Sequence, residues 1–213
     1  MSDHSPRRGR PAGETGADLL AVARGVFLER EFAGTTMAEV AARARISKAS
    51  LYRAHPSKDA LYGAVVSDWA AAGRHAIRPA LDRLIEGTSI VEDLTAFART
   101  LRSAVLSPEV LSMRRLVSGE AVSKPEVAAL YFADSWERNI DALATTFRVL
   151  DNAERLSIPD ARTAADQFTW LTVGAPLNQM LLTDTTRPPA TDGIPAAIEL
   201  FLARYHSQSG LLP

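Results

Sequence analysis

Lys48, Ser50, Tyr52 and Arg53 lie in one short segment, and each carries a side chain that donates hydrogen bonds. An ammonium, a guanidinium and two hydroxyls suit the phosphate oxygens and base edges of duplex DNA, which accept such bonds. A solvated helix face is the alternative, since most charged faces are solvated. The Ser-x-x-x-Leu-Tyr spacing that begins at Ser47, directly after a capped short helix, favours contact with DNA.

Two short helices must position these side chains. Thr36 can cap the first helix, and Glu39 stands at its third position, so the pair forms a capping box. The apolar residues that follow recur at i, i+3, i+4 and i+7, which predicts one buried stripe. This stripe consists of Met37, Val40, Ala41 and Ala44.

Ser47 begins the second helix after only a few residues, too few for a strand or a long loop. The small Ala41 lets the second helix cross the first at close range, and Ile46 and Leu51 hold it there. Two short helices joined by a tight turn form a helix-turn-helix, whose second helix fits the major groove of DNA.

Residues of the turn and of the second helix predict particular contacts. Lys48, Ala49 and Ser50 occupy the positions expected to read bases, and the Ala49 methyl group suits a thymine methyl. Arg45, in the turn, either reaches a phosphate or stays in solvent.

The basic segment near the N-terminus offers a second route to DNA. Residues 7–11 contain an Arg-Gly-Arg-Pro core that is similar to an AT-hook. Guanidinium groups on a flexible arm can enter the narrow, negative minor groove of A·T tracts. Taken alone, a solvated basic terminus is the better interpretation. Its place before a helix-turn-helix favours the minor groove, with Arg8 and Arg10 as the contacts.

The rest of the chain is helical in every window, without period-two alternation. A first helix covers Leu19–Arg30 and ends near Gly34. Ser57 can cap a helix that runs to about Arg74, after which Pro79 interrupts the pattern or starts a short helix. Further helix starts carry Pro and an acid in the first turn. The other predicted helices are Ile90–Leu106, Pro108–Val122, Pro125–Leu150, Asp160–Leu182 and Ile194–His206.

Charge is distributed unevenly along the 213 residues, a length that admits one large domain or two small ones. Residues 1–60 hold 10 Lys and Arg against 7 Asp and Glu, a net charge of +3. Residues 61–213 hold 14 against 18, a net charge of −4. This change of sign is typical of a basic DNA-binding end attached to an acidic body.

Several classes of function have no support in the sequence. The chain has no Cys, which excludes disulfides, thiolate catalysis and Cys-ligated zinc and fits a reducing cytoplasm. No His lies four residues from another His, and there is no Gly-rich phosphate loop or Ser nucleophile elbow. We therefore predict no enzyme, no cofactor and no metal site. The longest uncharged run, residues 167–183, is too short and polar for a membrane span.

Over Thr35–Leu61 the chain resembles the N-terminal signature of TetR-family transcriptional regulators, with the pattern T-T-M-A-E-V-A-x-x-A-x-I-S-x-x-x-L-Y-x-x-x-x-S-K-x-x-L. The resemblance covers about Gly16–Val65. It implies that Tyr52 and Lys58 contact phosphates. Lys58 also begins a helix, where exposed backbone N–H groups hold a phosphate, and Thr36 can act in the same way.

Three positions depart from this signature. The family usually has Gly in the turn where this chain has Arg45. An L-residue in a left-handed conformation costs about 1–2 kcal/mol, so the turn is either strained or shaped differently. Ala54 and His55 stand where the family usually has Tyr or His and then Phe. A phosphate-contacting ring is therefore missing at Ala54, and His55 replaces part of that role or part of the packing.

Residues 115–117, 120–121 and 125–127 resemble the C-terminal domain of AefR-like members of the family. This resemblance implies an all-helical domain that senses a ligand and forms a homodimer through Asp160–Leu182 and Ile194–His206. Core packing is the default for its large apolar residues, and the resemblance favours a pocket lined by some of them. The candidates are Phe97, Leu101, Met113, Leu116, Phe132, Trp136, Trp170 and Met180.

Together these patterns predict an all-α protein. We expect a flexible basic arm over residues 1–15, a helix-turn-helix DNA-binding domain over 16–56 and a helical ligand-binding and dimerisation domain over 57–213. The resemblance implies a bacterial cytoplasmic homodimer, on the nucleoid when bound to DNA, that represses a near-palindromic operator and is released by a small apolar effector. The helix from Ser57 would transmit the signal. An activator or architectural protein, and a helical enzyme or regulator that has lost DNA binding, are the alternatives.

Overall fold

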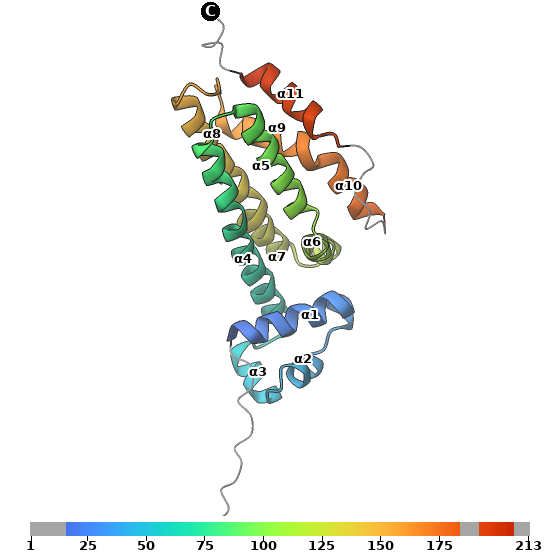
Figure 1. Cartoon of the computed structure of the whole chain (residues 1–213). Coiled ribbons are helices and arrows are strands. Elements are labelled where there is room, and N and C mark those ends of the chain that lie inside the picture. Colours follow the sequence, from blue (N-terminus) through green and yellow to red (C-terminus); the bar gives the residue numbers. More distant parts are fainter. Residues whose placement is uncertain (1–15, 184–191, 207–213) are drawn as a thin grey trace, which may run out of the picture. The chain divides into compact units, whose positions relative to one another are not determined.

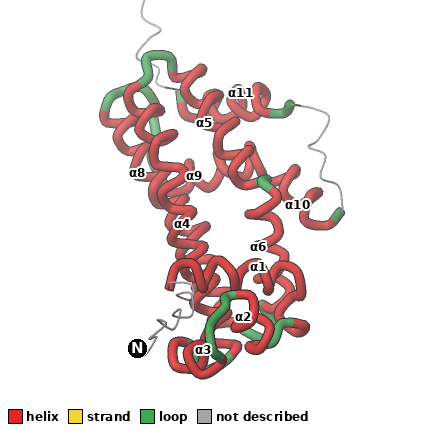
Figure 2. The backbone as a smooth tube through the Cα atoms, turned by 60° about the horizontal axis from the view of Figure 1, so that its bottom comes forward, coloured by secondary structure: helices red, strands yellow, loops and turns green. Residues whose placement is uncertain are grey.

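The computed structural model describes residues 16–183 and 192–206, apart from the side chains of residues 16, 17 and 74–76. In these ranges the regular elements are helices, as the sequence predicted (Figure 2). The β contact is an isolated bridge between Leu156 and His206. The chain divides into two compact units, Met1–Val65 and Val66–Pro213.

The first unit is built from short helices. They are α1 (Gly16–Gly34), α2 (Met37–Arg43), α3 (Lys48–Ala54) and the beginning of α4 (Lys58–Glu86), labelled in Figure 1. The predicted stripe on α2 is buried, and Leu51 of α3 has no exposed surface. The predicted helix-turn-helix is therefore present.

The boundary of the first unit falls inside α4, after Val65, whereas the sequence led us to expect it after residue 56. Leu61, Tyr62 and Val65 are all buried. The Tyr62 ring packs edge-on against Phe27 and Phe32 of α1, with centroid distances of 5.3 and 5.2 Å. These contacts make the first turns of α4 part of the core of this unit.

Helix α4 continues through Pro79 to Glu86, so the prediction that it ends near Arg74 is wrong. A proline removes one backbone hydrogen bond from a helix and usually bends or ends it. Pro79 itself is exposed, while Ala80, which follows it, is buried. The apolar face after the proline is therefore buried in the core, and this burial offsets the lost hydrogen bond.

The second unit holds the remaining helical elements (Figure 1), with a small apolar cluster of Leu111, Leu177 and Met180 and a larger main core. Side chains from α4, α5, α8, α9 and α11 meet there, and Phe168 packs against Phe97, Phe147 and Phe201 with centroid distances of 5.7, 5.7 and 5.1 Å. The elements are α5 (Ile90–Val105), α6 (Pro108–Glu120), α7 (Pro125–Tyr131), η1 (Phe132–Glu137), α8 (Arg138–Asn152), α9 (Ala161–Thr169), η2 (Trp170–Gly174), α10 (Ala175–Leu182) and α11 (Ile194–Tyr205).

Side-chain caps explain why several helices begin where the sequence predicted. Ser107 Oγ accepts a hydrogen bond of 3.3 Å from the Val110 N–H at the start of α6. The Asp160 carboxylate accepts bonds of 3.0 and 3.2 Å from the N–H groups of Arg162 and Thr163 at the start of α9. Each cap pairs N–H groups that a helix start leaves without an internal partner.

Two predicted helices are interrupted by π-helical segments, which the sequence did not indicate. The segment η1 separates α7 from α8, and η2 separates α9 from α10. The rings of Trp136 in η1 and Trp170 in η2 lie 5.5 Å apart. A Cβ atom on Gly174 would lie 2.7 Å from Cε3 of Trp170, so the absence of a side chain at Gly174 makes room for the indole.

Among the helices in the described ranges, none combines the length and apolar character that crossing a bilayer requires.

Candidate nucleic-acid interface and ligand cavity

Helix α3 is fixed by a cap at its start and one buried residue at its centre. Ser47 Oγ accepts a hydrogen bond of 3.0 Å from the Ser50 N–H, and the two hydroxyls lie 2.9 Å apart. Leu51 is fully buried, whereas Lys48, Tyr52 and Arg53 are exposed. The side of α3 opposite Leu51 is therefore open to a partner, as the sequence predicted.

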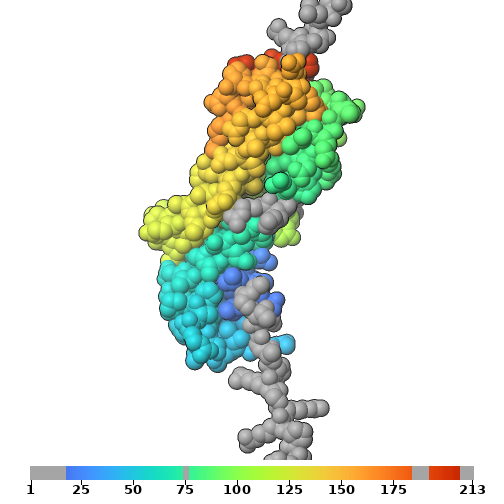
Figure 3. Space-filling model, turned by 90° about the vertical axis from the view of Figure 1, so that its left-hand side faces the viewer, coloured from blue at the N-terminus to red at the C-terminus, as the bar shows by residue number. Residues whose placement is uncertain are grey.

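The surface of α2 and α3 is seen in light blue and cyan in Figure 3. On α3 it carries Ala49, which is exposed, and Tyr52, of which 48% is exposed. Ser50 is partly buried, and its hydroxyl lies within 3.4 Å of Arg53 Nη2. These groups can donate to phosphate oxygens and base edges, while the Ala49 methyl group can contact a thymine methyl.

Ion pairs divide the cations of this unit into two groups. Arg43 contacts the carboxylates of Glu29 and Glu39 at 2.7 and 2.8 Å, and Glu39 also lies 3.5 Å from Arg30. Within the described part of the chain, no carboxylate pairs with Arg45, Lys48 or Arg53. The uncompensated positive charge therefore gathers at the turn and on α3, where DNA phosphates would neutralise it.

The predicted capping box is only half formed. Thr36 Oγ1 accepts a bond of 3.2 Å from the Glu39 N–H and so caps α2. The Glu39 carboxylate does not complete the box, because it binds Arg43 instead. The Thr36 side chain is exposed, so it remains available to a phosphate.

The turn between α2 and α3 places Arg45 in the left-handed region, with φ of 55°. Its N–H donates to the Ala42 carbonyl at 3.2 Å, and the next N–H, that of Ile46, donates to the Ala41 carbonyl at 3.0 Å. These bonds end α2 in the usual left-handed way, which favours glycine. Of the two outcomes that the sequence left open, the strained turn is the one present.

Lys58 has a different environment from the one that the sequence predicted. Its Nζ donates to the carbonyls of Phe32, Ala33 and Thr35 at 2.8, 3.4 and 3.1 Å, and it lies 4.3 Å from the centre of the Phe32 ring. An ammonium has three protons, and all three are used here. In the absence of DNA, Lys58 therefore caps the end of α1, and its phosphate contact stays a prediction.

A second strained residue lies at that end of α1. Glu31 has φ of 57° and ψ of 178°, a combination found almost only in glycine. Thr35 Oγ1 donates to the Glu31 carbonyl at 2.7 Å, and Lys58 binds the carbonyls that follow. This strain is not predictable from the sequence, because nothing in the pattern marks Glu31 as a non-helical position.

The remaining predicted DNA contacts stand as follows. The His55 N–H donates to the Leu51 carbonyl at 2.8 Å and ends α3, and the side chain of His55 is partly buried. Ala54 is exposed and leaves the predicted gap in ring contacts. Arg8 and Arg10 lie outside the described residues.

Known proteins provide the context for this geometry. Residues 19–65 match the bacterial regulatory proteins of the tetR family, and residues 92–207 match the C-terminal domain of AefR-like transcriptional repressors. The chain belongs to the TetR family. It is thus a DNA-binding transcriptional regulator whose helix-turn-helix lies in the first unit.

Solved structures of TetR-family proteins have the same fold. A transcriptional regulator of the family from Mesorhizobium loti is 25% identical, with a TM-score of 0.84 over 91% of this chain and 100% of that one. The flavonoid-responsive regulator FrrA is 27% identical, with a TM-score of 0.70 over 89% and 96% of the two chains. No curated protein sequence matches the chain.

In this TetR-family chain, the second unit contains a cavity of about 140 Å³ between α4, α5, α6, α7, η1 and α8. Its wall is mostly apolar and includes the rings of Trp69, Tyr131 and Trp136. Its polar groups come from Arg114, Ser135 and Asn139. The other lining residues are Ala70, Gly73, Ile77, Leu101, Ala104, Val105 and Val110.

Of the eight predicted pocket residues, Leu101 and Trp136 line this cavity. Phe97 lines a separate hollow of about 240 Å³, and Met113, Leu116 and Met180 are buried elsewhere in the unit. Phe132 and Trp170 are 53% and 55% exposed. Helical spacing alone does not distinguish a residue of the core from one that lines a cavity or one that is exposed, because large apolar residues occur in all three environments.

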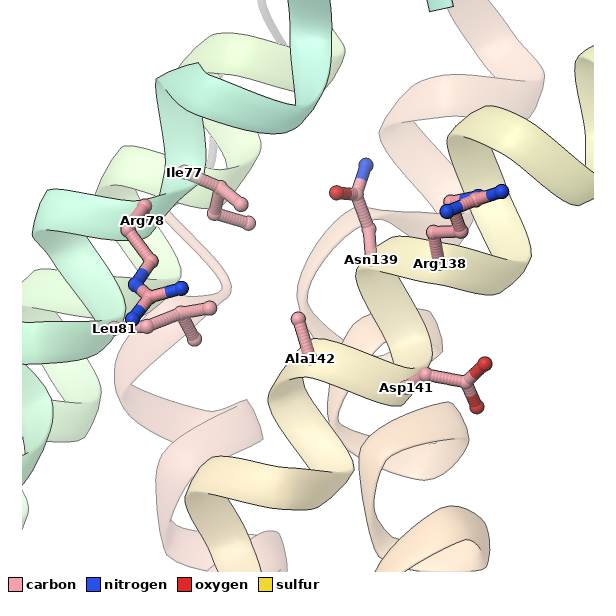
Figure 4. Close-up of a pocket in the computed structure, with 7 residues that line it drawn as sticks. All are labelled: Ile77, Arg78, Leu81, Arg138, Asn139, Asp141 and Ala142. Carbon is pink, nitrogen blue, oxygen red and sulfur yellow. The ribbon is translucent and has the colours of Figure 1, made fainter. Parts of the chain in front are cut away.

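A larger, shallower hollow of about 380 Å³ lies beside the cavity, between α4 and α8 (Figure 4). Ile77 and Asn139 line both spaces and lie on opposite sides of the hollow in Figure 4. Each charged residue of the hollow has a protein partner. The pairs are Arg78 with Asp82 at 3.5 Å, Arg138 with Asp134 at 2.8 Å and Asp141 with Arg162 at 2.8 Å.

Proposed function

We propose that this TetR-family protein is a homodimeric repressor of a near-palindromic operator and that a small molecule in the cavity releases it. The support for DNA contact is the exposed face of α3 with Lys48 and Arg53, together with Arg45 in the turn, since none of the three has a carboxylate partner among the described residues. Two such helices related by a two-fold axis would reach half-sites separated by about 10 bp or a multiple of it. Repression follows when the bound dimer blocks transcription.

Each predicted DNA contact has a role in this proposal. Lys48, Ala49 and Ser50 face the bases, with Ser47 holding the start of α3. Backbone contacts come from Thr36, Arg45, Tyr52, Arg53 and His55, and minor-groove contacts from Arg8 and Arg10. Lys58 positions α1 against α4.

Selection of bound fragments from random duplex DNA tests the proposal, because it measures binding and reads the operator together. Tyr52→Phe should weaken binding to all sequences by about three- to ten-fold, since one phosphate hydrogen bond is worth about 1 kcal/mol. Lys48→Ala should instead change the preferred bases, because a base contact carries discrimination of about 1–3 kcal/mol.

Glu92→Gln is a suitable control, because Glu92 is exposed in the second unit and far along the chain from α3. It should leave both affinity and preference unchanged. A wild-type chain that retains no duplex at low salt would refute the proposal and favour a regulator that has lost DNA binding.

Dimerisation is supported by exposed apolar side chains on the last helical elements. Trp170 and Leu171 of η2 are 55% and 43% exposed, and Leu182 of α10 and Leu200 of α11 are 78% and 62% exposed. Large apolar residues gathered on one region of a folded chain commonly mark a subunit interface. They lie in Asp160–Leu182 and Ile194–His206, the segments that the resemblance assigned to the dimer.

Release by a small molecule is supported by the cavity and by the name of one relative. FrrA is described as flavonoid-responsive, and we extend response to a small molecule, not to a flavonoid, to this chain. A ligand changes operator affinity only by as much as it distinguishes the two conformations, so a ten-fold release needs about 1.4 kcal/mol of coupling. Transcription measured with and without the gene separates a repressor from an activator.

A further inference from the structure

Arg114 of α6 is a partly buried cation in the cavity wall, and no anion among the described residues pairs with it. Its Nε is buried and makes no hydrogen bond. Across residues 16–183 and 192–206, the rest of its guanidinium also makes no hydrogen bond or ion pair. The ring centre of Trp136 lies 5.0 Å from the Cζ of Arg114. A π face attracts a cation more weakly than a carboxylate does, and it accepts no bond from Nε.

The other polar groups around the cavity do not neutralise this charge. Burial raises the pKa of the Tyr131 phenol, so Tyr131 is a neutral group at physiological pH. Ser135 uses its hydroxyl to donate to the Tyr131 carbonyl at 2.7 Å. Asn139 is an uncharged amide. None of these groups is an anion.

The two acids of η1, the segment that carries Trp136, are already paired with other cations. Glu137 binds Arg162 through both oxygens at 2.8 Å, and Asp134 binds Arg138 at 2.8 Å. In the adjoining hollow of Figure 4, Asp141 is likewise paired. The contrast between fully paired charges in the hollow and unpaired Arg114 in the cavity indicates a role for Arg114 toward a bound molecule.

Arg114 is partly buried, and a partly buried charge is stabilised when a counter-ion pairs with it. We infer that the effector of this cavity is a small aromatic acid whose carboxylate pairs with Arg114 and whose ring packs against Trp69 and Trp136. This inference rests on the proposed function in taking the cavity as the effector site. It adds the chemical class of the effector and the residue that selects it.

The size of the cavity restricts the ring system. A cavity of about 150 Å³ with apolar walls is known to hold one benzene molecule, and the present cavity measures about 140 Å³. A single-ring acid therefore fits with its ring in the apolar part. A multi-ring flavonoid would require the walls to move apart, so the effector class differs from the one that names FrrA.

Calorimetric titration of the full-length protein with benzoate, benzamide and toluene tests the inference. All three have one ring, and only benzoate carries a negative charge. A charge-assisted bond is worth about 1.5–3 kcal/mol, so benzoate should bind about ten-fold or more tightly than benzamide. Quenching of tryptophan fluorescence provides a second readout, because Trp69 and Trp136 line the cavity.

Arg114→Met keeps an unbranched side chain of similar length and removes the charge. It should abolish the preference for benzoate over benzamide while leaving toluene binding intact, which also shows that the variant is folded. Arg148→Met is the matched control. Arg148 is exposed on α8, and within residues 16–183 and 192–206 it donates only to Thr145, at 3.0 Å, so its loss should change none of the three affinities.

The inference is overturned if the wild-type protein binds none of the three compounds, if it binds benzoate no more tightly than benzamide, or if Arg114→Met keeps the preference. Operator binding with and without benzoate separates this result from the proposed function. Selective benzoate binding with unchanged operator affinity would support the effector chemistry and contradict ligand release. If the protein binds no operator, only the proposed repressor function is contradicted, and the inference on effector chemistry is unaffected.

Discussion

At the scale of single residues, the DNA-binding unit contains two L-residues in conformations that favour glycine. Arg45 has φ of 55° in the turn, and Glu31 has φ of 57° and ψ of 178° at the end of α1. Each conformation costs about 1–3 kcal/mol. For Arg45 the exposed guanidinium beside α3 is a reason to tolerate the strain. For Glu31 the structure shows no compensating contact of the side chain.

Replacing Glu31 with glycine should therefore stabilise the protein. The gain from relieved strain exceeds the entropy that glycine adds to the unfolded chain, about 0.5–1 kcal/mol, and leaves a net gain of about 1 kcal/mol. Denaturant unfolding measures this change. Ala38→Gly, at an exposed site inside α2, should instead destabilise the protein by about 0.5–1 kcal/mol. A loss of stability in Glu31→Gly would contradict the assigned strain.

Lys58→Met should reduce stability without changing the electrostatics of DNA binding. Removing the ammonium leaves the carbonyls of Phe32 and Thr35 without their donor, which costs about 2 kcal/mol for charge-assisted bonds. Unfolding in denaturant gives the first quantity, and the salt dependence of operator affinity gives the second. If the slope of log affinity against log salt concentration falls by about one in the variant, Lys58 contacts a phosphate, as the sequence predicted.

Lys58 and Arg114 show which residue roles the sequence leaves undetermined. The sequence placed Lys58 at a helix start but gave no information on the carbonyls of α1, which come from more than twenty residues earlier in the chain. Arg114 stands in a stretch of ordinary helix pattern, and its lack of a partner is a property of the folded unit. The cap residues Ser47 and Thr36 were predictable, because a cap acts within three residues of itself.

At the scale of helices, boundaries follow from the sequence and interruptions do not. A proline and an acid in the first turn predicted the starts of α6 and α7. The π-helical segments η1 and η2 depend on the mutual packing of Trp136 and Trp170, which lie on different helices, so no local pattern reveals them. The passage of α4 through Pro79 depends in the same way on the core that it helps to form.

The cap of α9 provides a pH-dependent prediction. Hydrogen bonds from the Thr163 hydroxyl and backbone hold the pKa of Asp160 below its ordinary value. The carboxylate therefore stabilises the folded protein above the ordinary Asp pKa of about 4, and this contribution disappears as the pH falls through the lower folded value. Asp160→Ala should lower the melting temperature at neutral pH, and the difference from wild type should shrink as the carboxylate is protonated.

Asp160→Asn is the control for this cap, because an amide oxygen also accepts from helix N–H groups. It should retain most of the stability at neutral pH and lack the acid-dependent difference. Thermal melts of the three proteins between neutral and acidic pH compare them directly. If Asp160→Ala lowers the melting temperature equally at every pH, the charge of Asp160 contributes nothing to the stability of the fold.

At the scale of the whole molecule, the proposed dimer depends on apolar side chains that a single copy leaves exposed. Leu200→Glu places a charge on α11 where 62% of the leucine is exposed, so it should not disturb the fold of one copy. It should convert a dimer into a monomer in light scattering and weaken operator binding by about 100-fold or more, since each half-site then binds alone. Val122→Glu, at a site 97% exposed outside the last helices, should remain dimeric.

The indole of Trp136 lies beside the Arg114 guanidinium on the cavity side and contacts the half-exposed Trp170 of η2. If Trp170 is covered when two copies associate, occupancy of the cavity and pairing of subunits alter one another by the same factor. The dose of effector required for a response would then depend on how many copies of the regulator a cell holds. Cells with scarce protein and cells with abundant protein would respond at different thresholds to the same compound.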